Sequence, residues 1–161
     1  QVGYVTHMLN EDEEENPNDP LSLHRRKVPA GVQVFEVSGP FFFGAADKFK
    51  NAISEVEDKP RILILRMRHV LSLDATAIQA LESVNDRTRR EQTTLILSGV
   101  HAQPLIVLER SGLLDKIGED NVHTNIDNAL DRARILLGLP SEPRPGPFVA
   151  SVSREQPPTD H

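Results

Sequence analysis

Apolar residues recur along the chain at two alternating spacings, one typical of β-strands and one typical of α-helices. Two segments, residues 62–65 and 94–97, are nearly continuous apolar runs, which is typical of central strands covered on both faces. Three further segments have a strand-like composition, residues 2–9, 32–37 and 122–124. The pattern therefore predicts about five strands.

Between the predicted strands, apolar residues lie three or four positions apart, which places them on one face of an α-helix. This spacing predicts about four helices, within residues 46–56, 77–91, 104–110 and 126–137. Pro104 suits the first turn of a helix, and Gly112 and Gly138 follow the last two helices, as glycine often does at helix ends.

The alternation of strands and helices predicts an α/β fold, with a mostly parallel central sheet and the helices packed on it. The first strand is joined by a long loop, so we expect it to lie antiparallel at an edge. Ligands and partners of such sheets usually meet the loops at the carboxyl ends of the strands. These loops are residues 38–44, 68–75, 98–103 and 124–125.

The composition indicates one domain, residues 1–139, followed by a tail, residues 140–161. An acidic loop within residues 10–20 follows the first predicted strand. The tail holds six of the twelve prolines and few large apolar residues, so we expect it to be disordered. Because the chain begins at Gln1, without a Met or a leader sequence, we expect it to be a piece of a longer protein.

The net charge of −6 argues against binding to nucleic acid or to an anionic membrane surface, because both depend on clustered Lys and Arg. The chain has no cysteine, which excludes disulfides, zinc–thiolate sites and thiol nucleophiles. Its apolar stretches are far shorter than the roughly 18 residues that a membrane-spanning helix needs.

No catalytic motif is present in the sequence. The nine glycines are spaced for neither a dinucleotide-binding loop, nor a phosphate-binding loop, nor a Gly-x-Ser-x-Gly elbow. No two of the six histidines lie four positions apart, the spacing at which a helix brings two histidines to one metal ion. We therefore predict no catalytic residue, no metal site and no cofactor.

The segment of greatest interest joins the most buried predicted strand to the second predicted helix. Its small and hydroxylated residues leave backbone N–H groups free at a helix N-terminus, which favours a small anion or the phosphate of a nucleotide. Helix capping is the alternative interpretation, either by Thr76 in a capping box with Gln79 or by Asp74. The candidate residues of this segment are Ser72, Asp74, Ala75, Thr76 and Ala77.

Two neighbouring groups could extend this site. Arg66, Arg68 and His69 precede the segment, and they are either solvated charges at a strand end or a positive rim around the loop. Three consecutive phenylalanines, residues 41–43, cannot all point inward from an extended chain, so we expect one to be exposed for docking. The candidate partner-binding residues there are Gly39, Phe42 and Gly44.

Three stretches, taken together and in this order, resemble the STAS domain, a module shared by sulfate transporters of the SulP family and by anti-sigma-factor antagonists. They are residues 39–46 (GPFFFGAA), residues 72–77 (SLDATA) with Leu81 after them, and residues 97–100 (LSGV) running into residues 112–118 (GLLDKIG). The resemblance extends over residues 2–137.

The phenylalanine segment and the acidic loop are closer to the bacterial SulP transporters than to the antagonists. In those transporters the STAS domain follows the last transmembrane helix. The resemblance therefore implies a non-catalytic regulatory or assembly domain on the cytoplasmic face of the inner membrane, within a multi-pass sulfate or anion transporter. The implied partners are the transmembrane domain of its own transporter, a cytoplasmic protein or a second copy.

The antagonists supply the alternative function, a free-standing phosphorylation switch. In their Asp-Ser-Ser-Gly motif, the partner kinase phosphorylates the second serine. Ala75, Thr76 and Ala77 replace the two serines and the glycine here, so a hydroxyl is retained at the position of the modified residue. The resemblance thus makes Thr76 a candidate phosphorylation site.

Overall fold

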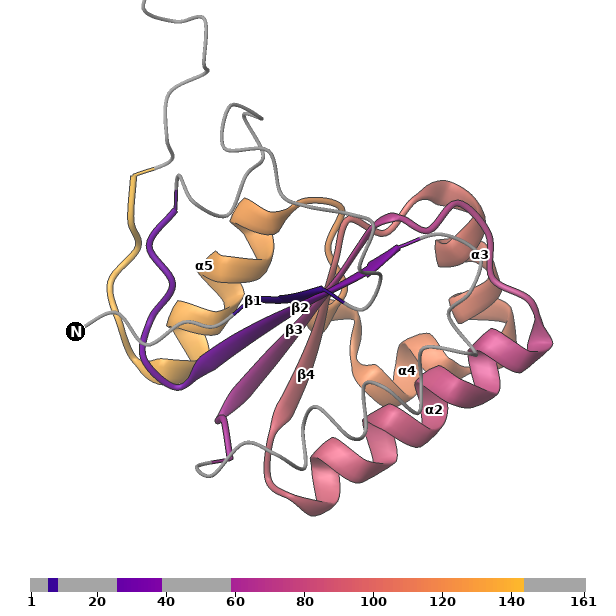
Figure 1. Cartoon of the computed structure of the whole chain (residues 1–161), viewed down its shortest axis with the longest axis horizontal. Coiled ribbons are helices and arrows are strands. Elements are labelled where there is room, and N and C mark those ends of the chain that lie inside the picture. The colour runs from indigo at the N-terminus through magenta and orange to yellow at the C-terminus, as the bar shows by residue number, and fades with distance from the viewer. Residues whose placement is uncertain (1–5, 9–25, 39–58, 144–161) are drawn as a thin grey trace, which may run out of the picture.

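A computed structural model of the chain describes residues 6–8, 26–38 and 59–143 (Figure 1). A parallel sheet lies at its centre, and its described strands are β1 (Thr6–Met8), β2 (Val32–Ser38), β3 (Ile62–His69) and β4 (Thr94–Ser98). They lie side by side in chain order. The first six residues of β3 are buried, as predicted for a central strand.

The first strand lies at an edge of the described sheet, as predicted, but it runs parallel to its neighbour, so the predicted antiparallel orientation was wrong. Thr6 lies opposite Val34, and Met8 lies opposite Glu36, in parallel register. A parallel pair needs a connection of about a dozen residues or more, and residues 9–31 separate β1 from β2. A connection of that length can return the chain in either direction, so the hydrophobic pattern does not fix the orientation.

The predicted strand at residues 122–124 is reduced to a single parallel bridge between Val122 and Leu97. Two backbone hydrogen bonds continue the pairing, because His123 N–H donates to the Leu97 carbonyl over 2.9 Å and Val100 N–H donates to the His123 carbonyl over 3.1 Å. This short segment therefore covers the outer edge of β4 only near its carboxyl end.

The described helices are α2 (Ala75–Arg90), α3 (Ala102–Ser111), α4 (Leu113–Ile117) and α5 (Ile126–Leu137), with a 3-10 turn, η2 (Glu119–Asn121). Helix α4 was not predicted, because it is short and is separated from α3 only by Gly112, whose φ of 84° ends one helix and begins the next. The predicted helix within residues 46–56 lies outside the described residues, as do the acidic loop and the tail from residue 144 onward.

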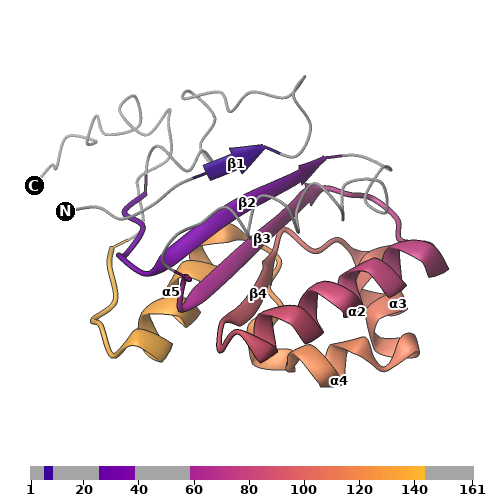
Figure 2. The same cartoon turned by 60° about the horizontal axis from the view of Figure 1, so that its bottom comes forward.

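Helices cover both faces of the sheet, which confirms the predicted α/β fold (Figure 2). Because side chains alternate along a strand, β2–β4 divide their apolar residues between two cores. Helix α5 packs on the core that contains Val34, Ile64 and Ile96. Helices α2, α3 and α4 pack on the core that contains Phe35, Leu65 and Leu97.

Candidate functional site

The loop between β3 and α2 contains the predicted site and leads directly into the first turn of the helix. The side chain of Asp74 accepts a hydrogen bond from the backbone N–H of Ala77 over 2.8 Å. The Asp74 cap, one of the two predicted alternatives, is therefore the one that forms. The Thr76 capping box does not form, because the helix begins at Ala75 and Thr76 already lies within its first turn.

The exposed residues of this loop and of the first turn of α2 define a surface that we call the β3–α2 loop surface. Leu71 is its one large apolar member, with 70% of its surface exposed. The sequence analysis did not single out Leu71, although an apolar residue within a predicted loop was a usable signal. The other exposed members are Ser72, Asp74, Ala75 and Thr76.

Two contacts hold the loop in place beneath this surface. Leu73 is buried, with 4% of its surface exposed, and its backbone N–H donates to the side-chain carbonyl of Gln103 over 2.9 Å. Next to it, a ring nitrogen of His101 forms a 2.7 Å hydrogen bond with the Arg68 carbonyl. The β4–α3 loop thus fixes the β3–α2 loop, a contact between distant segments that no local sequence signal indicates.

A buried ion-pair cluster lies behind the loop, at the carboxyl ends of β2 and β3. Glu36 is fully buried, and its carboxylate accepts hydrogen bonds from the Arg68 guanidinium over 2.7 and 3.3 Å. Arg66, with 2% of its side chain exposed, has a nitrogen 3.7 Å from the same carboxylate. His69 Nε2 lies 3.5 Å from it.

This cluster corrects both interpretations for the two arginines, whereas His69 has 44% of its side chain exposed. Arg66 and Arg68 are neither solvated strand-end charges nor an exposed positive rim, because their guanidinium groups are paired with Glu36. Glu36 lies opposite Arg66 in the parallel register of β2 and β3. The sequence analysis did not single out Glu36, since its partners are about thirty positions away and only strand pairing brings them together.

The β4–α3 loop approaches this cluster through Gly99. The φ of Gly99 is 69°, and a β-carbon built on it would lie 2.7 Å from the Arg68 backbone nitrogen. Ser98, just before it, lies opposite Arg66, and its hydroxyl is buried without a hydrogen-bond partner among the described residues. The Leu97-Ser98-Gly99-Val100 stretch is therefore tightly packed against β3, and only glycine fits at its third position.

The N-terminus of α2 is the place where the sequence predicts a bound anion or the phosphate of a nucleotide. The Asp74 carboxylate lies where an anion bound to this helix end would lie, and it uses the Ala77 N–H. A second negative group would meet like-charge repulsion there, which weighs against a bound anion. Three predicted site residues of the neighbouring loop, Gly39, Phe42 and Gly44, lie outside the described residues.

Two negative observations apply to residues 6–8, 26–38 and 59–143 alone. Within them, no three His, Asp or Glu side chains are grouped so that they could hold a metal ion. No helix in the same ranges combines the length and the apolar character needed to cross a bilayer.

Comparison with known proteins gives consistent matches. A family model described as "STAS domain" matches residues 25–131. The chain is 33% identical over 106 residues to a putative sulfate transporter, YvdB, of Bacillus subtilis, covering 65% of this chain and 20% of that protein. It is 26% identical over 113 residues to a probable sulfate transporter, Rv1739c, of Mycobacterium tuberculosis, covering 68% and 20%. This chain thus matches only about a fifth of the length of these relatives.

Solved structures agree with these matches. A sulfate transporter family protein from Wolinella succinogenes is 39% identical with a TM-score of 0.71, and the match covers 74% of this chain and 98% of that one. The STAS domain of a SulP transporter from Vibrio cholerae is 31% identical with a TM-score of 0.65, covering 74% and 94%. On the family model, these identities and the shared fold, the chain belongs to the STAS domain family, in the branch found in SulP sulfate transporters.

Proposed function

We propose that this chain is the cytoplasmic STAS domain of a SulP-type sulfate transporter, and that it acts without catalysis as a regulatory or assembly domain. Its relatives are named as sulfate transporters, and it corresponds to about a fifth of their length. A domain that forms a small part of a transporter and has no catalytic motif is suited to modulate the transmembrane part through protein contacts.

The β3–α2 loop surface is the proposed contact surface, and its combination of exposure and fixed backbone is the observation that carries the proposal. Leu71 and Thr76 are exposed, while the Gln103 hydrogen bond and the Asp74 cap hold the loop backbone between them. A preformed surface loses little conformational entropy when a partner binds. The transmembrane domain of the same transporter is the proposed partner.

The test is a matched pair of charge substitutions in the intact transporter. Thr76→Glu places a negative charge in the contact surface, whereas Ser83→Glu places the same charge on the same helix, two turns further along, at another exposed position. We expect uptake of radiolabelled sulfate per transporter in the membrane to change about fivefold or more for Thr76→Glu and to stay unchanged for Ser83→Glu. Equal uptake and equal abundance for both variants would refute the role of this surface.

Phosphorylation of Thr76 is a second way to use the same surface. A phosphate would add about −1.5 to −2 charges in the first turn of α2, where the helix dipole favours it and the Asp74 carboxylate opposes it. The exposed hydroxyl supports this candidate. Mass spectrometry of the protein purified from its own cells should then find phosphate on Thr76, and a purified kinase that modifies the chain should not modify Thr76→Ala.

A further inference from the structure

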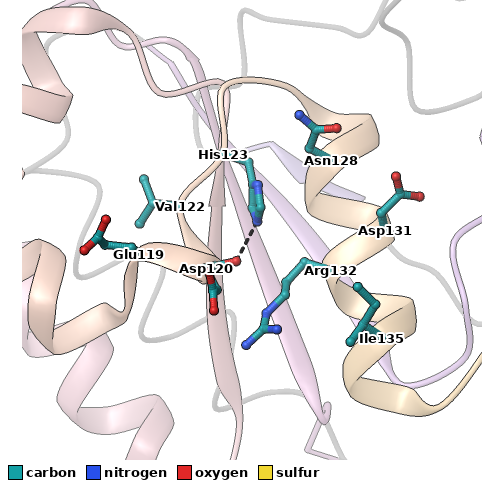
Figure 3. Close-up of a pocket in the computed structure, with 8 residues that line it drawn as sticks. All are labelled: Glu119, Asp120, Val122, His123, Asn128, Asp131, Arg132 and Ile135. Atoms are coloured by element: carbon teal, nitrogen blue, oxygen red, sulfur yellow. Dashed lines mark hydrogen bonds between the residues drawn. The ribbon is translucent and has the colours of Figure 1, made fainter.

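A groove runs along the side of the domain beyond β4, away from the β3–α2 loop surface. Its larger part is a depression of about 610 Å³ between α5 and the segment around η2 (Figure 3). Arg132 and Ile135 line it from α5, and Asp120 and His123 line it from the opposite side. Because one wall is a regular helix and the other is held to β4 by the Leu97–Val122 bridge, the depression is part of the folded framework.

A smaller depression of about 350 Å³ continues the groove toward α3. Leu105, Ile106 and Leu114 line it, and it shares Glu119 and Val122 with the larger one. The two depressions are therefore neighbours that lie on either side of the segment bearing Glu119 and Val122 (Figure 3), and we call the pair the α3–α5 groove.

Three large apolar side chains lie exposed among the polar residues of the groove, and nothing in the described part of the chain covers them. Ile135 has 68% of its surface exposed, Ile106 46% and Leu105 37%. These three are most of the large apolar residues that the described structure leaves exposed. Because these residues gather along one groove and are not scattered singly over the surface, they indicate a binding surface.

The charge of the groove is predominantly negative. Glu109, Glu119 and Asp120 are exposed along it, and their carboxylates have no ion-pair partner within residues 6–8, 26–38 and 59–143. The two basic side chains are directed to neutral partners, because the Arg132 Nε donates to the Asn121 side-chain carbonyl over 2.9 Å and the His123 Nε2 lies 2.7 Å from the Asp120 carbonyl. The groove thus offers apolar contacts flanked by unpaired carboxylates.

We propose that the α3–α5 groove binds a Lys- and Arg-bearing amphipathic helix from a cytoplasmic segment of the transporter itself. Grooves of this kind bind the apolar face of a helix, with charged side chains at the rim. Charge complementarity selects a basic helix, and the cytoplasmic segments that flank transmembrane helices are enriched in Lys and Arg. That the helix comes from the transporter itself rests on the function proposed above. The apolar and basic character of the helix does not.

The chemistry is tested with the purified 161-residue chain and a synthetic peptide that is helical, with leucine on one face and lysine on the other. Glu119→Lys should weaken binding about tenfold, a loss of about 1.4 kcal/mol, because Glu119 belongs to both depressions. Asp86→Lys makes the same charge change at an exposed position of α2 and should leave binding nearly unchanged. Equal weakening by both variants would mean that only net charge matters and would overturn the proposal.

The apolar contacts of the groove are tested with a second matched pair of variants. Ile135→Ser should weaken binding of the same peptide, whereas Leu71→Ser, an equally exposed apolar residue on the β3–α2 loop surface, should not. A peptide with glutamate in place of lysine should not bind. Binding of the glutamate peptide, or equal effects of the two serine variants, would overturn the proposal.

The donor is tested by photo-crosslinking in the intact transporter, with a photoreactive residue at position 135 or at position 71. Position 135 should crosslink to a basic cytoplasmic segment of the transporter, and a crosslink from it only to lipid or to an unrelated protein would overturn the proposal.

The two proposals fail separately. If peptide binding is absent while Thr76→Glu still alters uptake, only the groove proposal is wrong, and if the peptide binds while Thr76→Glu has no effect, only the loop surface is wrong.

Discussion

Two neighbouring groups of residues lie at the carboxyl ends of β2 and β3, and they differ in burial and in the pairing of their charges. The cluster of Glu36 with Arg66 and Arg68 is buried and its charges are paired. The β3–α2 loop surface, only a few residues beyond Arg68, is exposed, and the Gln103 hydrogen bond and the Asp74 cap hold it in place. The comparison teaches that charge in a strand-end segment does not identify a binding site. The cluster stabilises the position of β3, whereas the loop leaves its own side chains exposed to solvent.

The strongest test of the difference between the buried cluster and the loop surface is Glu36→Gln, which removes the buried negative charge. Removing one partner of a buried ion pair typically costs about 3–5 kcal/mol, because the guanidinium groups of Arg66 and Arg68 lose their counter-charge. Urea unfolding of the 161-residue chain, followed by circular dichroism, measures the loss.

The matched control for this variant is Glu91→Gln. Glu91 makes ion pairs with Lys59 and Arg87 at 3.8 and 3.4 Å, but about a quarter of its side chain is exposed, so we expect a loss of at most about 1 kcal/mol. If the two variants lose the same free energy of unfolding, the buried cluster does not have the stabilising role assigned to it.

The second test concerns the packing of the β4–α3 loop against the cluster. Gly99→Ala should cost about 2–4 kcal/mol, since it combines a left-handed backbone with a contact of 2.7 Å to the Arg68 backbone. Gly112→Ala is the control, because Gly112 has a similar φ of 84° and a β-carbon added there would meet no atom within 4 Å. It should cost about 1–2 kcal/mol. A cost for Gly99→Ala no larger than that would show that the close approach is easily relieved.

The sequence was sufficient for the features that depend on local pattern. The hydrophobic pattern predicted the strands β2, β3 and β4 and the helices α2, α3 and α5, because each buries apolar residues in one of the two cores. It did not predict the orientation of β1, the pairing of Glu36 with Arg66, or the Leu73–Gln103 hydrogen bond. All three depend on which distant segments meet, which local spacing does not encode. The α3–α5 groove was missed for the same reason.

The third test asks whether Asp74 stabilises α2 through its capping hydrogen bond. Asp74→Ala removes the hydrogen bond to the Ala77 N–H and should cost about 1 kcal/mol of unfolding free energy. Asp74→Asn retains a side-chain oxygen at the cap and should cost much less. If both variants lose the same stability, the charge of Asp74 and not its hydrogen bond stabilises the helix, and the capping role assigned here is wrong.

The smallest expected effect on stability belongs to the exposed loop, where Leu71 and Leu73 form a natural pair. Leu73 has 4% of its surface exposed and Leu71 has 70%, although they are two positions apart. Leu73→Ala should cost about 2–5 kcal/mol, because it leaves a cavity under the loop. Leu71→Ala should change the free energy of unfolding by no more than about 0.5 kcal/mol, since its side chain already contacts water.

In the transporter proposed above the expectation for Leu71 is different, because a contact residue matters only when its partner is present. Leu71→Ala should lower sulfate uptake while membrane abundance stays the same. A stability-neutral variant that alters uptake would identify Leu71 as a contact residue, and unaltered uptake would remove it from the proposed surface.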